Sequence, residues 1–217
     1  MPASLTPPSK ARAAVRRKLI AAARSAKGGK ARTGRPLPRA FFLTDPVRTP
    51  DHLAIVRRLP RGMGVIWRHY GEARRYATGL ALARLCRRRG LVLLVAADPA
   101  LAARIGAHGV HWPESKLRGV RPRSRRMIET AAAHSRAAVA QAARLGVDAV
   151  LVSAVFPSRS PSAGPPMGAL RFRQLVRAAT IPVYALGGID ASNAGAAMPH
   201  AAGWAAIDSV LAGWGRS

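Results

Sequence analysis

From Ala40 to the C-terminus, short apolar runs alternate with stretches in which apolar residues recur at helical spacing. Several of the apolar runs are continuous, as is typical of strands that are covered on both faces. The predicted strands are residues 41–44, 64–67, 91–96, 109–111, 127–131, 149–153, 183–186 and 204–207. The predicted helices between them are residues 51–59, 72–89, 99–105, 136–145, 170–178 and 193–198.

Strand–helix units in series predict an α/β protein with a parallel sheet, because each helix carries the chain back to the start of the next strand. Eight such units predict a closed (β/α)8 (TIM) barrel. Residues 40–217 would make a compact one, since these barrels usually have roughly 200–250 residues. A doubly wound open sheet is the structural alternative.

The chain is strongly basic, with 36 Lys and Arg residues against 9 Asp and Glu residues. Eleven of the basic residues and no acidic ones lie in residues 1–39, which we expect to form a separate N-terminal tail and linker. Residues 10–27 could form a basic helix, but its apolar stripe is thin, and glycines and prolines follow it. We therefore expect a disordered extension before a barrel at 40–217, with non-specific nucleic-acid binding through residues 1–39 as one role.

Composition excludes several other classes of protein. A single cysteine, Cys86, cannot form an internal disulfide framework and is typical of a reducing compartment, so we expect a cytoplasmic protein. No apolar stretch is long enough to span a membrane, and we expect no membrane partner. The apolar run at residues 19–23 is too short for the core of a signal peptide. The sequence makes no prediction of oligomeric state.

In a (β/α)8 barrel, functional residues collect where the strands end. Gly187 and Gly188 follow the seventh predicted strand, and their backbone N–H groups could approach an anion closely. Asp208 and Ser209 follow the eighth. The loops after strands 7 and 8 commonly bind phosphate in these barrels, so we predict a phosphate site here. The alternative for the glycines is a tight turn.

Further candidates follow other strands. Ser158 and Ser160 lie in a long loop at residues 157–168, and loops of this length are often lids or binding loops. Arg68 and Arg159 are the basic residues best placed to bind a phosphate or diphosphate. Asp98 is a candidate metal ligand, or it could cap the helix that follows.

A set of short motifs occurs in a fixed order along this region. The most specific is IPVYALGGI at residues 181–189, which is followed by Asn193. The others are FLTD at 42–45, AHGVH at 107–111, AHS at 133–135, GVDAV at 146–150, VFPS at 155–158 and MG at 167–168. In this order and spacing, which cover nearly the whole chain after Phe41, they resemble the thiamine phosphate synthase/TenI family of (β/α)8 proteins.

The resemblance implies an enzyme of thiamine biosynthesis, of which two kinds exist. The synthases join a pyrimidine, carried as a diphosphate ester, to a thiazole phosphate and release pyrophosphate with the help of Mg²⁺. TenI-like relatives tautomerise a thiazole phosphate carboxylate with a histidine as acid and base, and need no metal. That histidine corresponds to His134 in this sequence, while His111 belongs to the strand-4 motif and is expected to pack or orient its neighbours.

The sequence departs from the synthase pattern where the diphosphate and the metal should bind. Of the family's Gln-x-Arg-x-Lys only Arg68 remains, and Lys116 stands where a second metal-binding Asp is expected. Asp208 replaces a serine beside the expected phosphate, where a carboxylate is unfavourable unless it is paired. His134 and the glycines are retained, so the residues slightly favour a tautomerase. A synthase is the alternative, and a non-catalytic phosphate-binding or nucleic-acid-associated protein is a further one.

Overall fold

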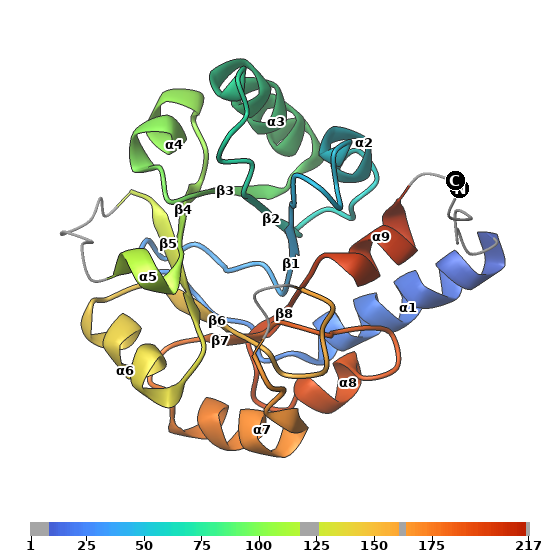
Figure 1. Ribbon diagram of the computed structural model, residues 1–217, viewed down its shortest axis with the longest axis vertical. Helices are drawn as coiled ribbons and strands as arrows, with labels where there is room; N and C mark the ends of the chain where they lie inside the picture. The colour runs from blue at the N-terminus through green and yellow to red at the C-terminus, as the bar shows by residue number, and fades with distance from the viewer. Residues whose placement is uncertain (1–8, 118–125, 161–163, 216–217) are drawn as a thin grey trace.

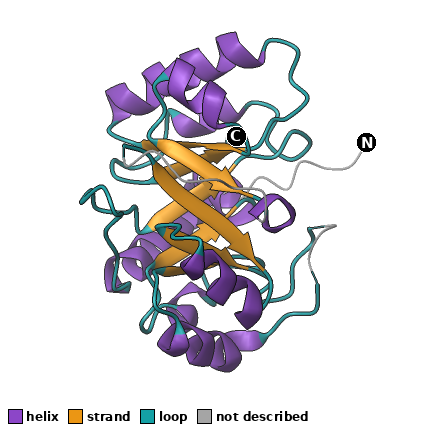
Figure 2. Cartoon of the chain, turned by 90° about the vertical axis from the view of Figure 1, so that its left-hand side faces the viewer, coloured by secondary structure: helices purple, strands orange, loops and turns teal. Residues whose placement is uncertain are grey.

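Eight parallel strands form a closed ring in which each strand pairs with the next in sequence and β8 pairs with β1. The structure, a computed structural model, describes residues 9–117, 126–160 and 164–215. Figure 2 shows the strands enclosed by helices on both sides. The ring confirms the predicted (β/α)8 barrel and excludes the open sheet. Its strands are β1 (Ala40–Leu43), β2 (Gly64–Trp67), β3 (Val92–Ala96), β4 (Gly109–Trp112), β5 (Ile128–Ala133), β6 (Ala149–Val152), β7 (Val183–Ala185) and β8 (Gly203–Ala206).

The helices surround this ring (Figure 1). The six helices predicted between the strands are confirmed, with shifted ends in most cases. Two further short helices, α5 and α9, were not predicted. The helices are α1 (Ser9–Ser25), α2 (His52–Val56), α3 (Arg75–Arg89), α4 (Pro99–Ile105), α5 (Glu114–Leu117), α6 (Arg136–Arg144), α7 (Gly168–Ala178), α8 (Ala194–Ala197) and α9 (Asp208–Trp214).

The core has two layers because successive side chains of a strand point to opposite faces. In β1, Phe41 and Leu43 belong to the cluster inside the barrel, while Phe42 belongs to the cluster between strands and helices. The interior leaves little room on the neighbouring strand. A Cβ at Gly64 would lie 2.2 Å from the ring of Phe41, so only glycine fits opposite this phenylalanine.

The expectation of a disordered tail is wrong from residue 9 onward, while residues 1–8 of the expected tail lie outside the described residues. Residues 9–25 form helix α1, which lies along α8 and α9 (Figure 1). Leu19 and Ala22 are buried in the outer core, and the indole N–H of Trp204 donates to the Leu19 carbonyl over 3.1 Å. The apolar stripe is narrow, but small residues let the helix pack closely, so a few buried contacts suffice.

The linker expected before residue 40 is also not disordered, because residues 26–39 close the N-terminal end of the barrel. Arg32 donates from its backbone N–H and its Nε to the buried carboxylate of Asp148, over 2.7 and 3.0 Å. The hydroxyl of Tyr184 donates to the Pro38 carbonyl over 2.6 Å. Ala31 and Leu37 join the interior cluster, so this segment forms the floor of the barrel.

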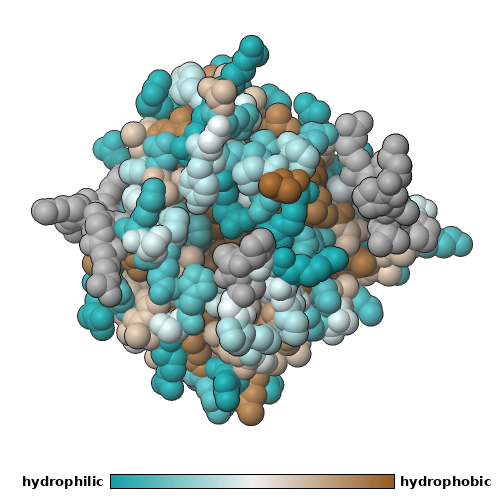
Figure 3. All heavy atoms as spheres, viewed as in Figure 1, coloured by the Kyte–Doolittle hydropathy of each residue, from teal (hydrophilic) through white to brown (hydrophobic). Residues whose placement is uncertain are grey.

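Hydrophobic residues are scattered over the face seen in Figure 3 rather than gathered in one continuous area. The large hydrophobic side chains that are exposed among the described residues are Val47, Tyr70, Tyr76 and Leu170. Within residues 9–117, 126–160 and 164–215, no helix is long and apolar enough to cross a membrane.

Because α1 packs on the barrel, a substitution in its buried face should destabilise the protein, whereas the same substitution in a disordered tail would not. Leu19→Ala should lower the free energy of unfolding by about 2–5 kcal/mol, because it leaves a cavity in the outer core. The neighbouring exposed Lys18→Ala should change it by less than about 0.5 kcal/mol. Urea denaturation of both variants tests this, and equal stabilities would mean that the helix does not pack on the barrel.

Candidate functional site

A cavity of about 1050 Å³ lies at the C-terminal end of the barrel. Apart from Val15 of α1, its lining comes from the ends of seven of the eight strands and the segments that follow them, which closure of the ring brings to one rim. Of the ten site residues predicted from the sequence, the structure brings nine together here, and only Asp98 is not among the lining residues. The nine are Arg68, His134, Ser158, Arg159, Ser160, Gly187, Gly188, Asp208 and Ser209.

The two glycines after β7 form a backbone cradle. Both have left-handed backbone angles, with φ of 85° at Gly187 and 64° at Gly188. A Cβ at Gly188 would lie 2.2 Å from the carbonyl oxygen of Pro157, so the loops after β6 and β7 touch here. Among the described residues, the N–H groups of both glycines have no acceptor, which leaves two donors at the cavity wall.

Ser209 supplies a third donor to the lining of the cavity. Ser209 is buried in the first turn of α9, and its hydroxyl oxygen has no hydrogen-bond partner within the described part of the chain. The first N–H groups of a helix also lack partners inside the helix. Together with the glycines, these groups form a site that suits an anion such as a phosphate. Ser158 and Ser160 lie in the loop beside it, whose residues 161–163 are outside the described residues.

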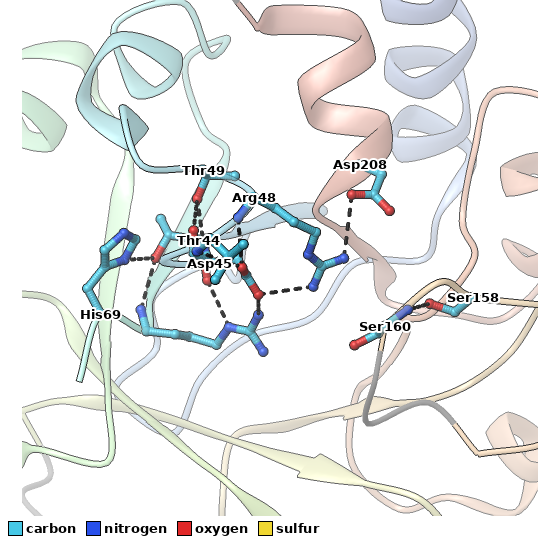
Figure 4. A network of polar contacts seen from close by, with 10 residues as sticks. Thr44, Asp45, Arg48, Thr49, His69, Ser158, Ser160 and Asp208 are labelled. Carbon is cyan, nitrogen blue, oxygen red and sulfur yellow. Dashed lines mark hydrogen bonds and ion pairs between the residues drawn. The ribbon is translucent and has the colours of Figure 1, made fainter. Parts of the chain in front are cut away.

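Two arginines and two aspartates form a chain of ion pairs along the rim (Figure 4). The carboxylate of Asp45 accepts from Arg48 over 3.1 Å and from Arg68 over 3.3 Å. Arg48 also reaches Asp208, over 3.4 Å. Burial would raise the pKa of Asp45, but hydrogen bonds from Arg48 and Val47 and the charge of Arg48 lower it. Asp208 therefore has the cationic partner that a carboxylate beside a phosphate site needs, and this partner is Arg48. Arg48 was not among the site residues predicted from the sequence.

Arg68 is fixed by its own neighbours. Its Nε donates to the Thr44 carbonyl and its backbone N–H to the Thr44 hydroxyl, both over 2.9 Å. The Thr44 hydroxyl also contacts Nδ1 of His69, at 3.0 Å (Figure 4). Burial lowers the pKa of Arg68, while the charges of Tyr70 and Asp45 act in the opposite direction. A cation that is held and partly desolvated in this way binds an incoming anion more strongly than one in bulk water.

His134 forms a pair with Glu114, a residue that was not predicted as part of the site. One carboxylate oxygen of Glu114 contacts both the backbone nitrogen and Nδ1 of His134, each at 2.7 Å. This leaves Nε2 as the nitrogen that can exchange a proton with a ligand. His111 also lines the cavity, but burial lowers its pKa to about 3, so it is neutral near pH 7. It contacts the Thr130 hydroxyl at 2.9 Å, which agrees with an orienting role.

Asp98 lies apart from these residues. One of its oxygens accepts from the Leu101 N–H at the start of α4 over 2.9 Å, and the other from Arg75 over 3.1 Å. The helix cap that the sequence left as an alternative is therefore what this side chain forms. Across residues 9–117, 126–160 and 164–215, no group of three or more His, Cys, Asp or Glu residues is arranged to hold a metal ion.

A family model described as thiamine monophosphate synthase (TMP-TENI) matches residues 47–210. Three curated proteins named thiamine-phosphate synthase are similar to the chain. That of Thioalkalivibrio sulfidiphilus is 36% identical over 145 residues, which are 63% of this chain and 66% of that protein. That of Alcanivorax borkumensis is 28% identical over 164 residues, 71% of this chain and 76% of that protein. That of Methylococcus capsulatus is 34% identical over 128 residues, 56% of each.

The similarity therefore covers slightly less than two thirds of the Thioalkalivibrio protein and just over half of the Methylococcus protein. Among solved structures, thiamine phosphate pyrophosphorylase from Pyrococcus furiosus superposes with a TM-score of 0.67 and 23% identity. The match covers 81% of this chain and 88% of that one. At this level of identity, the superposition supports the fold alone.

The backbone cradle can be tested without knowing the ligand. Gly188→Ala should weaken the binding of inorganic phosphate at least about tenfold, because the new methyl group displaces the loop and its donors. Gly195→Ala is the matched control, since a Cβ there meets no atom within 4 Å. Titration calorimetry measures both. Unchanged binding by the Gly188 variant would contradict a phosphate site at this loop.

Proposed function

Because the chain belongs to the thiamine monophosphate synthase family, we propose that it acts on a thiazole phosphate at the C-terminal end of its barrel. The family predicted from the motifs is confirmed by the match over residues 47–210. The ligand follows from the chemistry of the cavity, whose lining includes the backbone donors of Gly187 and Gly188 and the buried Ser209 hydroxyl. These groups suit the phosphate end of the ligand.

The reaction that we propose is thiamine phosphate synthesis, after which the similar curated proteins are named. The residues alone slightly favoured a tautomerase, and this proposal reverses that order. The size of the cavity is the observation that supports the synthase reaction. Its volume of about 1050 Å³ lies at the upper end of the range for ligand pockets, roughly 300–1,000 Å³. Two substrates must be held together for this reaction, and the cavity offers separate groups for the phosphate of one and the diphosphate of the other.

In this proposal, Arg68 and Arg159 bind the diphosphate of the pyrimidine substrate. As the bond to the pyrimidine forms and pyrophosphate leaves, negative charge accumulates on the departing oxygens, and fixed guanidinium groups stabilise it. Thr44 and Asp45 hold Arg68 in place before the substrate arrives. Arg48 neutralises Asp208, so that carboxylate does not repel the thiazole phosphate.

The family implies a bound Mg²⁺, but the carboxylates of this chain do not fit one. Mg²⁺ prefers several oxygen ligands in octahedral geometry. Asp98 pairs with Arg75 and caps α4, Asp45 and Asp208 pair with arginines, and Glu114 pairs with His134. Asp190, which also lines the cavity, accepts from the backbone N–H groups of Ser192 and Asn193. Among the described residues, no three possible ligands are grouped to hold a metal ion. The proposal therefore assigns the stabilisation of pyrophosphate to arginines alone.

A kinetic assay tests the synthase. With both the pyrimidine diphosphate ester and the thiazole phosphate present, the protein should release pyrophosphate, whether or not Mg²⁺ is added. Arg68→Ala should lower kcat/KM at least about a hundredfold, because it removes a fixed cation from the leaving group. Arg74→Ala, an exposed arginine that does not line the cavity, is the control. Release no faster than in buffer would reject the synthase.

One observation favours a second candidate, the tautomerisation of a thiazole phosphate carboxylate. The pair of Glu114 and His134 at the cavity wall is arranged as a carboxylate that orients an imidazole. Such an arrangement supports proton transfer by Nε2 to and from a ligand carbon. This reaction needs neither a diphosphate site nor a metal, so it agrees with the departures from the synthase pattern.

The tautomerase makes its own prediction. His134→Asn should lower kcat about 10²–10⁴-fold, because the proton carrier is lost, while binding of the phosphate ligand is retained. Glu114→Gln should lower kcat less, since it disturbs only the orientation of the ring. His200→Asn, at an exposed histidine outside the cavity lining, is the control. Full turnover in the His134 variant, followed by NMR, would exclude this reaction.

A further inference from the structure

The acidic residues of the chain are segregated toward one end of the barrel. Of the nine, seven lie after a strand or at the start of the following helix, on the side of the cavity. The other two, Glu129 and Asp148, lie at the opposite end, where both are buried. Arg32 is 3.9 Å from the first and 3.0 Å from the second. The N-terminal end of the barrel therefore has no exposed carboxylate within the described residues.

Arginines are concentrated at that same end. The last turn of α3 carries Arg87, Arg88 and Arg89, and Arg57, Arg58 and Arg61 follow α2. All six side chains are exposed. The C-terminus of a helix favours cations, which accounts in part for the position of those on α3. It does not account for Arg58 and Arg61, which lie beyond the end of their helix.

The two groups form one surface, here called the arginine surface and defined as these six arginines. The Gly62 N–H donates to the Gly90 carbonyl over 2.9 Å, and Arg89 donates to the Leu59 carbonyl over 3.2 Å. These bonds join the loop after α2 to the end of α3. Throughout the part of the chain that the structure describes, none of the six is in an ion pair.

The pKa of a nearby histidine is lowered in part by positive charges at this end of the barrel. His108 precedes β4, and its Nδ1 accepts from the Leu93 N–H over 3.1 Å. Burial lowers the pKa of His108, and so do the charges of Arg35 and Arg87. Arg87 therefore contributes to the positive field in the loop before β4, and a cluster of like charges favours an anionic partner.

We propose that the arginine surface binds the phosphate backbone of a nucleic acid, without sequence specificity. Guanidinium groups bind phosphate oxygens in a bidentate way, and an array of them releases counterions from a polyanion. The main alternative, an anionic membrane, also calls for apolar side chains that insert. The exposed large hydrophobic residues of the described chain lie instead on loops and helix starts at the cavity end: Val47, Tyr70, Tyr76 and Leu170.

The surface differs from the one expected from the sequence, which lay in residues 1–39. It is at the opposite end of the barrel from the cavity, so bound nucleic acid leaves the cavity open. The proposal does not depend on the proposed function.

Three variants of the full chain, each lacking three positive charges, test the proposal. Their binding to a fluorescent DNA duplex of about 20 base pairs is measured by anisotropy over a range of salt concentrations. Removing three phosphate contacts from the arginine surface should reduce the salt slope by about 2.7 and the affinity at low salt at least about tenfold. The variants are Arg58→Gln/Arg61→Gln/Arg88→Gln on the surface, Arg74→Gln/Arg136→Gln/Arg171→Gln at the cavity end, and Arg16→Gln/Arg17→Gln/Lys18→Gln on α1.

The proposal expects the first variant to lose affinity well beyond the other two, with an unchanged melting temperature. Equal losses of affinity in all three variants would overturn the proposal, because they would mean that only the overall charge matters. A larger loss in the α1 variant would also overturn it, because it would place the binding site on the N-terminal extension. Absence of duplex binding by the unmodified protein would also overturn the proposal. So would tighter binding to vesicles of phosphatidylcholine and phosphatidylserine than to the duplex.

Discussion

Closing eight parallel strands into a ring brings the carboxyl end of every strand to the same rim. The distance along the chain between two loops then no longer matters. Arg48 and Asp208 are 160 residues apart and form an ion pair, because β1 and β8 are neighbours in the ring. The pairing of β6 with β7 likewise brings Gly188 against Pro157 in the loop after β6. The cavity and all its chemistry depend on this geometry, and the helices outside hold it in place.

The charges of the rim show how the site tolerates its departures from the family pattern. A carboxylate at position 208, beside the expected phosphate, is acceptable because Arg48 shares its guanidinium between Asp208 and Asp45. The side chain of Arg68 is held by its hydrogen bonds to Thr44, although the family's Gln and Lys on either side of it are absent from this sequence. The rim is thus built from paired arginines and carboxylates, beside the backbone donors of Gly187 and Gly188.

The sequence predicted the barrel well because its strands are continuous apolar runs, and this signal is local. All eight predicted strands are present, and nine of the ten predicted site residues line one cavity. Short helices such as α5, with four residues, carry too little periodicity to be recognised. Arg48 and Glu114 were not selected because their importance lies in partners from distant loops, Asp208 and His134. The N-terminal extension was misjudged because its charge is visible in the sequence, whereas the close packing of Leu19 and Ala22 is not.

The central claim is that the backbone cradle of Gly187 and Gly188, together with Ser209, binds the phosphate of a thiazole phosphate. A crystal structure of the protein soaked with that compound tests it most directly. The account predicts the phosphate within hydrogen-bond distance of the Gly188 amide and of Ser209, with the thiazole ring directed toward His134. A phosphate bound elsewhere, for instance on the arginine surface alone, or a cavity that stays without the compound at saturating concentration, would contradict it.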